Sequence, residues 1–127
     1  MQVLLTDAAK GDLLAIARFI ARDSPLRALT FVAELEERCR RLADMPHGFP
    51  LVPGHEQAGV RRRIHGQYLI FYRVEGDRIV VLHVLHGAMD IDALKHIFKM
   101  LSANYPERLG RLRWHRKDRP KRGNLPP

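Results

Sequence analysis

Two stretches of helical periodicity that meet at a Ser-Pro pair constrain the fold more than any other feature of this sequence. The first stretch repeats apolar residues at the i, i+3, i+4, i+7 spacing of one helix face, at Leu13, Ile16, Ala17 and Ile20. Serine is a preferred N-cap, and proline at the first helical position loses no hydrogen bond, so Ser24-Pro25 starts a second helix almost without a linker. The sequence therefore predicts an antiparallel helical hairpin.

The residues around this hairpin predict a sheet. The second helix carries its own apolar stripe, at Ala28, Phe31, Val32, Leu35, Cys39 and Leu42. A short strand-like run (2–6) precedes the hairpin, and three more (60–65, 68–74 and 79–86) follow it, joined by connections short enough for hairpin turns. Asp90 or Asp92 is positioned to cap a further helix. We expect an α+β fold of order β-α-α-β-β-β(-α), with an antiparallel sheet packed against the helical hairpin.

The net charge of +8 is unevenly distributed along the chain. Residues 105–127 contain eight Lys/Arg and two acidic residues, whereas residues 1–104 contain 14 basic and 12 acidic residues. Apolar periodicity also decays beyond Asn104. We therefore expect one domain over 1–104 and a basic, mostly disordered tail over 105–127.

Several absences from the sequence indicate a cytoplasmic protein. No apolar run approaches the roughly 18–20 residues that span a bilayer, and the N-terminus lacks the basic and apolar segments of a signal peptide. The single cysteine, Cys39, excludes an internal disulfide and a thiolate metal cluster, and its place in the helix stripe predicts a core thiol.

The Arg61-Arg62-Arg63 run is the most conspicuous cluster of charge in the predicted domain. Alternation along a strand sends Arg62 to one face and Arg61 and Arg63 to the other, and Arg73 is a candidate to join that second group. Guanidiniums gathered on an open sheet face suit phosphate or carboxylate recognition, because each offers a rigid fork of donors. The alternative is solvated surface with salt bridges to acidic residues of the helices.

The histidines and tyrosines of the predicted strands offer weaker candidates. His83 and His86 are three residues apart on one strand, so they face opposite ways and cannot form a joint metal site from that strand alone. His86 has the chemistry of a general acid or base, although a structural hydrogen bond is the favoured interpretation. Tyr68 and Tyr72 share a face and are expected to pack against the sheet. The chain contains no phosphate-binding loop, nucleophile elbow or paired catalytic carboxylates, so the residues alone give little support for an enzyme.

An ordered set of segments over about residues 2–98 resembles the RelE/ParE toxin superfamily, its ParE-like branch in particular. The segments that carry the resemblance are Asp12-Leu13-x-x-Ile16, Ser24-Pro25-x-x-Ala28-x-x-Phe31, Leu42-Ala43-x-Met45-Pro46-x-Gly48, Tyr68-Leu69-Ile70-Phe71-Tyr72-Arg73-Val74 and Val84-Leu85-His86-x-x-Met89-Asp90. Each segment alone is weak, whereas their order and spacing together are fairly specific. The resemblance does not cover the tail.

This resemblance implies the toxin of a type II toxin–antitoxin (plasmid stabilisation) system, neutralised by a cognate antitoxin. ParE-like members act on DNA gyrase, whereas RelE-like members cut messenger RNA on the ribosome with clustered Lys/Arg and a tyrosine or histidine near the C-terminal end. Candidates for that nuclease role are Arg61, Arg63, Arg73 and His86. However, the chain has no lysine between Lys10 and Lys95 and no tyrosine between Tyr72 and Tyr105, which favours the gyrase-directed branch.

We therefore expect a binding toxin without cofactor or metal, whose target is DNA gyrase. The expected partner-binding residues are Arg61, Arg62, Arg63, Tyr68, Arg73, His86, Met89 and Asp90. A metal-independent, ribosome-dependent endonuclease of RelE type is the alternative. A third hypothesis is nucleic-acid binding through the basic tail, which steep salt dependence of the affinity would reveal.

Overall fold

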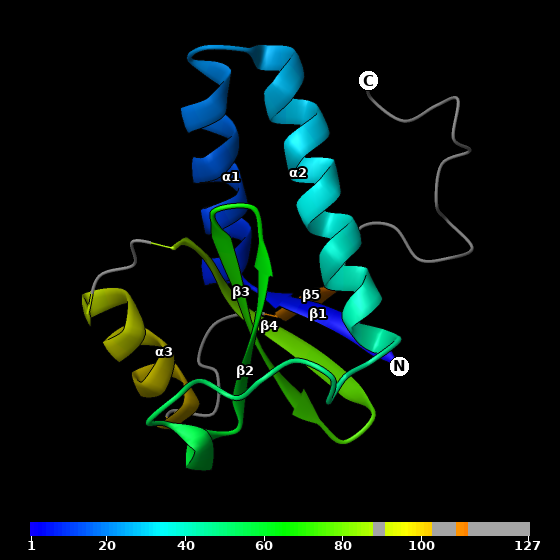
Figure 1. The fold of residues 1–127 in the computed structure, drawn as a ribbon, viewed down its shortest axis with the longest axis vertical. Helices are drawn as coiled ribbons and strands as arrows, with labels where there is room; N and C mark the ends of the chain where they lie inside the picture. The colour runs from blue at the N-terminus through cyan, green and yellow to red at the C-terminus, as the bar shows by residue number, and fades with distance from the viewer. Residues whose placement is uncertain (88–90, 103–108, 112–127) are drawn as a thin grey trace.

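The computed structural model describes residues 1–87, 91–102 and 109–111. The predicted helical hairpin is present near the N-terminus. Strand β1 (Gln2–Thr6) leads directly into α1 (Asp7–Ala21), and α2 (Pro25–Arg40) returns beside it. Figure 1 shows the two helices standing side by side. The Thr6 hydroxyl accepts a hydrogen bond from the Ala9 amide at 3.0 Å, and the Ser24 hydroxyl accepts one from the Arg27 amide at 3.1 Å. The predicted Ser24 cap and the Thr6 cap thus both satisfy otherwise unpaired first-turn amides.

The remaining elements follow in the predicted order, with one addition at the end. Two short 3-10 turns, Arg41–Ala43 and Glu56–Ala58, flank the loop after α2. The other elements are β2 (Val60–His65), β3 (Tyr68–Glu75), β4 (Arg78–His86), α3 (Ile91–Ser102) and β5 (Leu109–Arg111). Asp92 lies inside α3 rather than at its cap, and Asp90 lies outside the described residues.

The sheet is mixed, which corrects the expectation that it is antiparallel. Its strand order is β2-β3-β4-β1-β5, and β1 runs parallel to β4 with Val3 opposite Ile79. Strand β1 is separated from β4 in sequence by the hairpin and by two strands, so no tight turn forces the pair to be antiparallel. Strand β5 pairs antiparallel with the far side of β1, with Thr6 opposite Leu109. Three residues of the predicted tail are therefore part of the sheet, and the rest of 105–127 lies outside the described residues.

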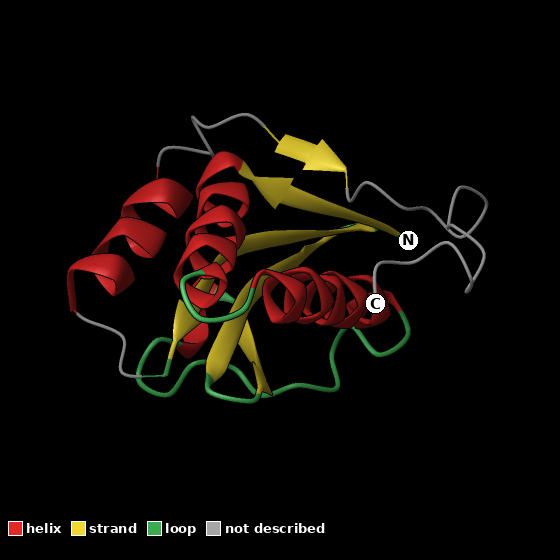
Figure 2. Cartoon of the chain, turned by 90° about the horizontal axis from the view of Figure 1, so that it is seen from above, coloured by secondary structure: helices red, strands yellow, loops and turns green. Residues whose placement is uncertain are grey.

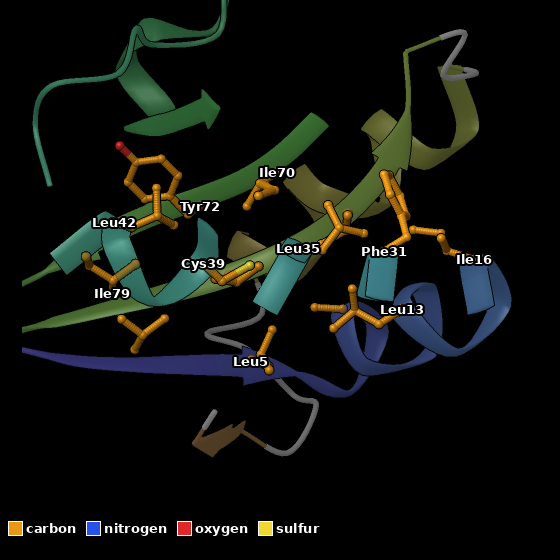
Figure 3. Close-up of a cluster of buried hydrophobic side chains, with 14 residues drawn as sticks. Leu5, Leu13, Ile16, Phe31, Leu35, Cys39, Leu42, Ile70, Tyr72 and Ile79 are labelled. Atoms are coloured by element: carbon orange, nitrogen blue, oxygen red, sulfur yellow. The ribbon is translucent and has the colours of Figure 1, made fainter. Parts of the chain in front are cut away.

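Helices cover both faces of the sheet, and each side has its own core (Figure 2). The hairpin side buries Leu35, Cys39 and Leu42 of the α2 region against Ile70 and Tyr72 of β3, as Figure 3 shows. The α3 side buries a smaller set, which consists of Val52, Val60, Leu69, Phe71, Val80, Leu82 and Ile97. Because both faces are covered, β3 and β4 read as continuous apolar runs rather than as alternating ones.

Candidate functional site

The strand register decides which arginines share a face. Arg61 is opposite Tyr72, and Arg63 is opposite Ile70, so both point to the hairpin side. Arg73 is instead opposite Val60, a residue of the α3-side core. Arg62, opposite Phe71, points to that same side. The expectation that Arg73 joins Arg61 and Arg63 is therefore wrong, because Arg73 shares its face with Arg62.

Arg61 and Arg63 are bound to backbone carbonyls rather than to acidic side chains. Arg61 Nη1 donates to the carbonyl oxygens of Phe49 at 2.7 Å and His47 at 3.3 Å. Arg63 Nη1 donates to the carbonyl of Arg38, in the last turn of α2, at 3.2 Å, and its guanidinium carbon is 4.8 Å from the Phe49 ring centroid. Burial, with the nearby Arg38 guanidinium, lowers the pKa of Arg63. These two arginines fasten the end of the hairpin to the sheet.

Arg62 and Arg73 present the opposite situation. Both are half-buried neighbours on β2 and β3, and neither side chain makes a hydrogen bond or ion pair with another described residue. The loop before β2 passes close by, since a Cβ added at Gly59 would be 3.6 Å from Arg73 Nε. Gly59 has a φ of +73°, a conformation that other residues adopt only with strain. Two guanidiniums without a counter-ion in the described chain suit an external carboxylate or phosphate.

The two tyrosines pack on the hairpin side, as expected. Tyr72 is fully buried, and its hydroxyl donates to the Pro46 carbonyl at 2.9 Å. Burial raises the pKa of this hydroxyl. Tyr68 packs on Phe31 at 5.4 Å and edge-on against the exposed His86 ring, also at 5.4 Å between centroids.

His86 is hydrogen-bonded through Nε2 to Gln67 Oε1 at 3.1 Å. This contact agrees with the structural interpretation of His86 preferred from the sequence. Cys39 is fully buried, as predicted, and burial raises the pKa of its thiol to about 12. Met89 and Asp90, the last two expected partner-binding residues, lie outside the described residues.

A network of one carboxylate and two histidines joins α1, β4 and α3, and the sequence analysis missed it. Asp12 Oδ2 is 2.7 Å from His83 Nδ1 and accepts a second hydrogen bond from the Val84 amide at 2.9 Å. On the other side of the ring, His83 Nε2 is 2.7 Å from His96 Nδ1. His83 and His86 do face opposite ways, as predicted, since His83 meets α3 and His86 is opposite Tyr68.

Two irregularities in the sheet create this network. Strand β1 ends at Thr6, so α1 takes its place beside β4, where the Thr6 hydroxyl donates to the Leu82 carbonyl at 2.8 Å and Asp12 accepts from Val84. The register of β4 against β3 also shifts, because Phe71 is opposite His83 whereas Tyr72 is opposite Val81. This bulge turns His83 to the α3 side. A polar residue inside the apolar run 79–85 was the available signal, but nothing in the sequence indicated its partners.

The outer surface of the hairpin carries large apolar side chains that the core stripes do not include. Leu14 and Phe19 on α1 and Leu26 and Leu29 on α2 are each 51–61% exposed. All four lie within about two helical turns of the connection between the helices. Arginines accompany them: the guanidinium of Arg22 lies 5.9 Å from the Phe19 ring centroid, and Arg18 and Arg27 are exposed nearby in the sequence. We call these four apolar residues the hairpin-end set. Single exposed apolar side chains are common on protein surfaces, whereas apolar surface that is contiguous marks protein–protein contacts.

None of the described helices is both long and apolar enough to cross a membrane. Residues 3–91 match the family described as "ParE toxin of type II toxin-antitoxin system, parDE". A solved structure described as "Chromosomal ParDE TA system from P. aeruginosa" is similar in fold, with a TM-score of 0.59 and 25% sequence identity, over 68% of this chain and 95% of that chain. Among curated proteins, none matches the chain. The family match covers well over half of the sequence and agrees with the resemblance seen in its motifs. This chain therefore belongs to the family of ParE toxins of type II toxin–antitoxin systems.

Proposed function

We propose that this ParE-family protein is a cytoplasmic binding toxin that an antitoxin neutralises and that inhibits DNA gyrase when free. The proposal that the toxin acts by binding rests on one observation: the arginines that a nuclease would need together are divided between the two faces of the sheet. Arg61 and Arg63 are engaged by backbone carbonyls on the hairpin side, and Arg73 lies on the other face of the sheet. The choice of gyrase rests on the ParE-like motifs and on family membership.

Phosphodiester cleavage requires cations placed together around the developing charge, with an acid and a base in reach of the same phosphate. Here the two faces of the sheet divide the candidate cations, and His86 is on the hairpin side beside Tyr68 and Gln67. No single phosphate can contact Arg61, Arg63 and Arg73 across a sheet that is covered on both faces. This division supports a toxin that acts by binding.

Two surfaces are suited to a protein partner. The hairpin-end set offers exposed apolar side chains with arginines nearby, which suits an amphipathic helix whose polar face is acidic. Arg62 and Arg73, which have no counter-ion among the described residues, suit carboxylates of the same partner. We propose that the antitoxin binds at the hairpin end and that the arginine pair adds charge complementarity.

The test combines a binding assay with a gyrase assay on the purified full chain. Phe19→Gln should weaken binding of the co-expressed antitoxin at least tenfold without changing the melting temperature, because the ring is 61% exposed. Lys10→Gln is the control, since it places the same amide at an exposed α1 position on the other side of the helix, more than two turns from Phe19. If Phe19→Gln and Lys10→Gln bind equally well, the antitoxin docks elsewhere.

The free toxin should inhibit supercoiling by gyrase and leave ribosome-bound messages intact. The same preparation is tested on translating ribosomes, with His86→Ala beside the wild type. Codon-positioned cuts that disappear in the His86→Ala protein would replace the gyrase proposal with the nuclease. Inhibited supercoiling with uncut messages would support it.

A further inference from the structure

We propose that Asp12, His83 and His96 form a proton-operated clamp that holds α3 on the sheet at neutral pH and releases it when both imidazoles are protonated. The clamp is built from three elements distant in sequence, and its two contacts are each 2.7 Å long. His83 is 7% exposed, whereas His96 is on the exposed side of α3. The buried ring therefore connects the interior of the domain to its surface helix.

The carboxylate determines where the protons of His83 lie. An ionised carboxylate only accepts hydrogen bonds, so His83 Nδ1 must carry the proton that points at Asp12. The Val84 amide, which donates to the same oxygen, holds the carboxylate in place. His83 Nε2 is then left as the atom that meets His96, and its protonation state decides the chemistry of the contact with α3.

The contact between the two rings holds one proton and no more. If His83 is neutral, its Nε2 lone pair accepts from a protonated Nδ1 of His96. If His83 carries the extra proton, its Nε2–H donates to the bare Nδ1 of His96. When both rings are imidazolium, two N–H groups and two positive charges face each other at 2.7 Å, and the contact must open. Histidine is the side chain whose charge ordinarily changes between about pH 5 and 8.

The other groups around the clamp do not replace this contact. From α1 the facing charge is Asp12, and across the sheet the neighbour of His83 is the apolar Phe71. On α3 itself, Lys95 and Lys99 are exposed and add positive charge to the same helix, which favours release. The loop before β2 contributes His55, which contacts Phe98 of α3 with 4.4 Å between ring centroids. Packing also holds α3 on the sheet, with Ile97 fully buried and Phe98 and Leu101 partly buried.

Linkage gives the expected pH dependence and its sign. The open form takes up one proton that the closed form cannot hold, so acidification favours opening. At pH values where both imidazoles of the open form are protonated, the ratio of closed to open α3 should fall about tenfold per pH unit. At pH values high enough to leave both rings neutral, the ratio should be constant.

The experiment is amide hydrogen exchange of the full chain between pH 8 and 5, corrected for the intrinsic exchange rate. Protection of α3 should fall relative to that of α2 with the tenfold slope. His96→Gln can hydrogen-bond to either form of His83, so α3 should stay protected at every pH. His96→Phe cannot, so α3 should be less protected at every pH, without a slope. Both substitutions alter an exposed residue and are expected to leave the rest of the domain folded.

His55→Gln is the control for the other histidine that touches α3, and it should keep the wild-type slope. Parallel protection of α3 and α2 at all pH values in the wild type would overturn the clamp. So would a slope that persists in His96→Gln, or one that His55→Gln removes.

Discussion

The two faces of the sheet are covered by helices that are attached in different ways. On the hairpin side, α1 and α2 bury a large apolar cluster. The sheet side chains Arg61, Arg63 and Tyr72 also donate hydrogen bonds to backbone carbonyls in the last turn of α2 and in the loop after it. On the α3 side a smaller cluster lies under the 12-residue helix α3, and hydrogen bonds through His83 reach that helix.

Similar burial on the two sides therefore does not mean that both sides unfold together with the rest of the domain. Leu35 and Ile97 are both fully buried, but Leu35 belongs to α2, whose last turn and following loop accept hydrogen bonds from Arg61, Arg63 and Tyr72 of the sheet. Elements with few contacts open locally, at lower free energy than the whole domain. We therefore expect the hairpin side to unfold with the domain and α3 to open by itself.

The largest expected effect comes from truncating these two core residues. Leu35→Ala should lower the free energy of unfolding by about 3 kcal/mol, because it leaves a cavity between the hairpin and the sheet. Ile97→Ala should mainly detach α3, with loss of its amide protection and a smaller shift of the urea midpoint. Urea unfolding and hydrogen exchange measure the two responses. Equal loss of protection throughout the domain in both variants would contradict the comparison.

Neighbouring arginines on β2 provide a matched pair of substitutions, because each substitution removes the same charge. Arg61→Ala should lower the free energy of unfolding by about 1 kcal/mol, since it breaks hydrogen bonds from a charged donor to the Phe49 and His47 carbonyls. Arg62→Ala should stay within about 0.5 kcal/mol of the wild type, because its side chain has no such partner among the described residues. Antitoxin binding should show the opposite order, with Arg62→Ala weakening the affinity more than Arg61→Ala does. An Arg62→Ala protein that is the less stable of the two would assign a structural role to the α3 side.

A single hydroxyl tests the polar contacts of the hairpin side. Tyr72→Phe should lower the free energy of unfolding by about 1 kcal/mol, because the Pro46 carbonyl loses its donor. Tyr68→Phe removes the same atom from the same strand and face, where no hydrogen bond of the hydroxyl is present among the described residues, and should cost less. Chemical denaturation of both proteins under one condition gives the answer. Equal losses would show that the Tyr72 contact contributes nothing specific.

The smallest expected effect is a pH dependence on the hairpin side. Burial, followed by the nearby Arg38 charge, lowers the pKa of His65, which stacks on Phe31 with 5.7 Å between centroids. The unfolded chain therefore takes up this proton at higher pH than the folded one, so stability falls as the pH drops below about 6.5. His65→Gln should flatten the dependence of the urea midpoint on pH between 7 and 5. An unchanged dependence would place its source elsewhere.

Local patterns predicted the hairpin well. The apolar spacing and the Ser24-Pro25 restart set both helices, since capping and periodicity act within a few residues of sequence. The three-stranded meander followed from short connections between apolar runs for the same reason. The parallel pairing of β1 with β4, and the pairing of β5 with β1, could not be predicted this way, because they join segments more than 70 residues apart.

In the candidate site, too, local patterns predicted what lies within one strand but not how residues of different strands are placed. Alternation correctly separated Arg62 from Arg61 and Arg63 within one strand, but placing Arg73 needed the register between strands, which turn geometry sets. The ParE-like motifs identified the family because they record residue types in order along the chain.

The helical hairpin, the meander, the buried Cys39 and the family of the protein could all be predicted from the order of residues along the chain. Three features became visible in the folded chain: which arginines lack a partner among the described residues, how β1 and β5 join the sheet, and the contacts among Asp12, His83 and His96. The two groups of features differ in the sequence distance over which the responsible interactions act. Capping and helical periodicity act between near neighbours in sequence, whereas Asp12 and His83 meet across 71 positions of the chain and depend on a one-residue bulge in β4.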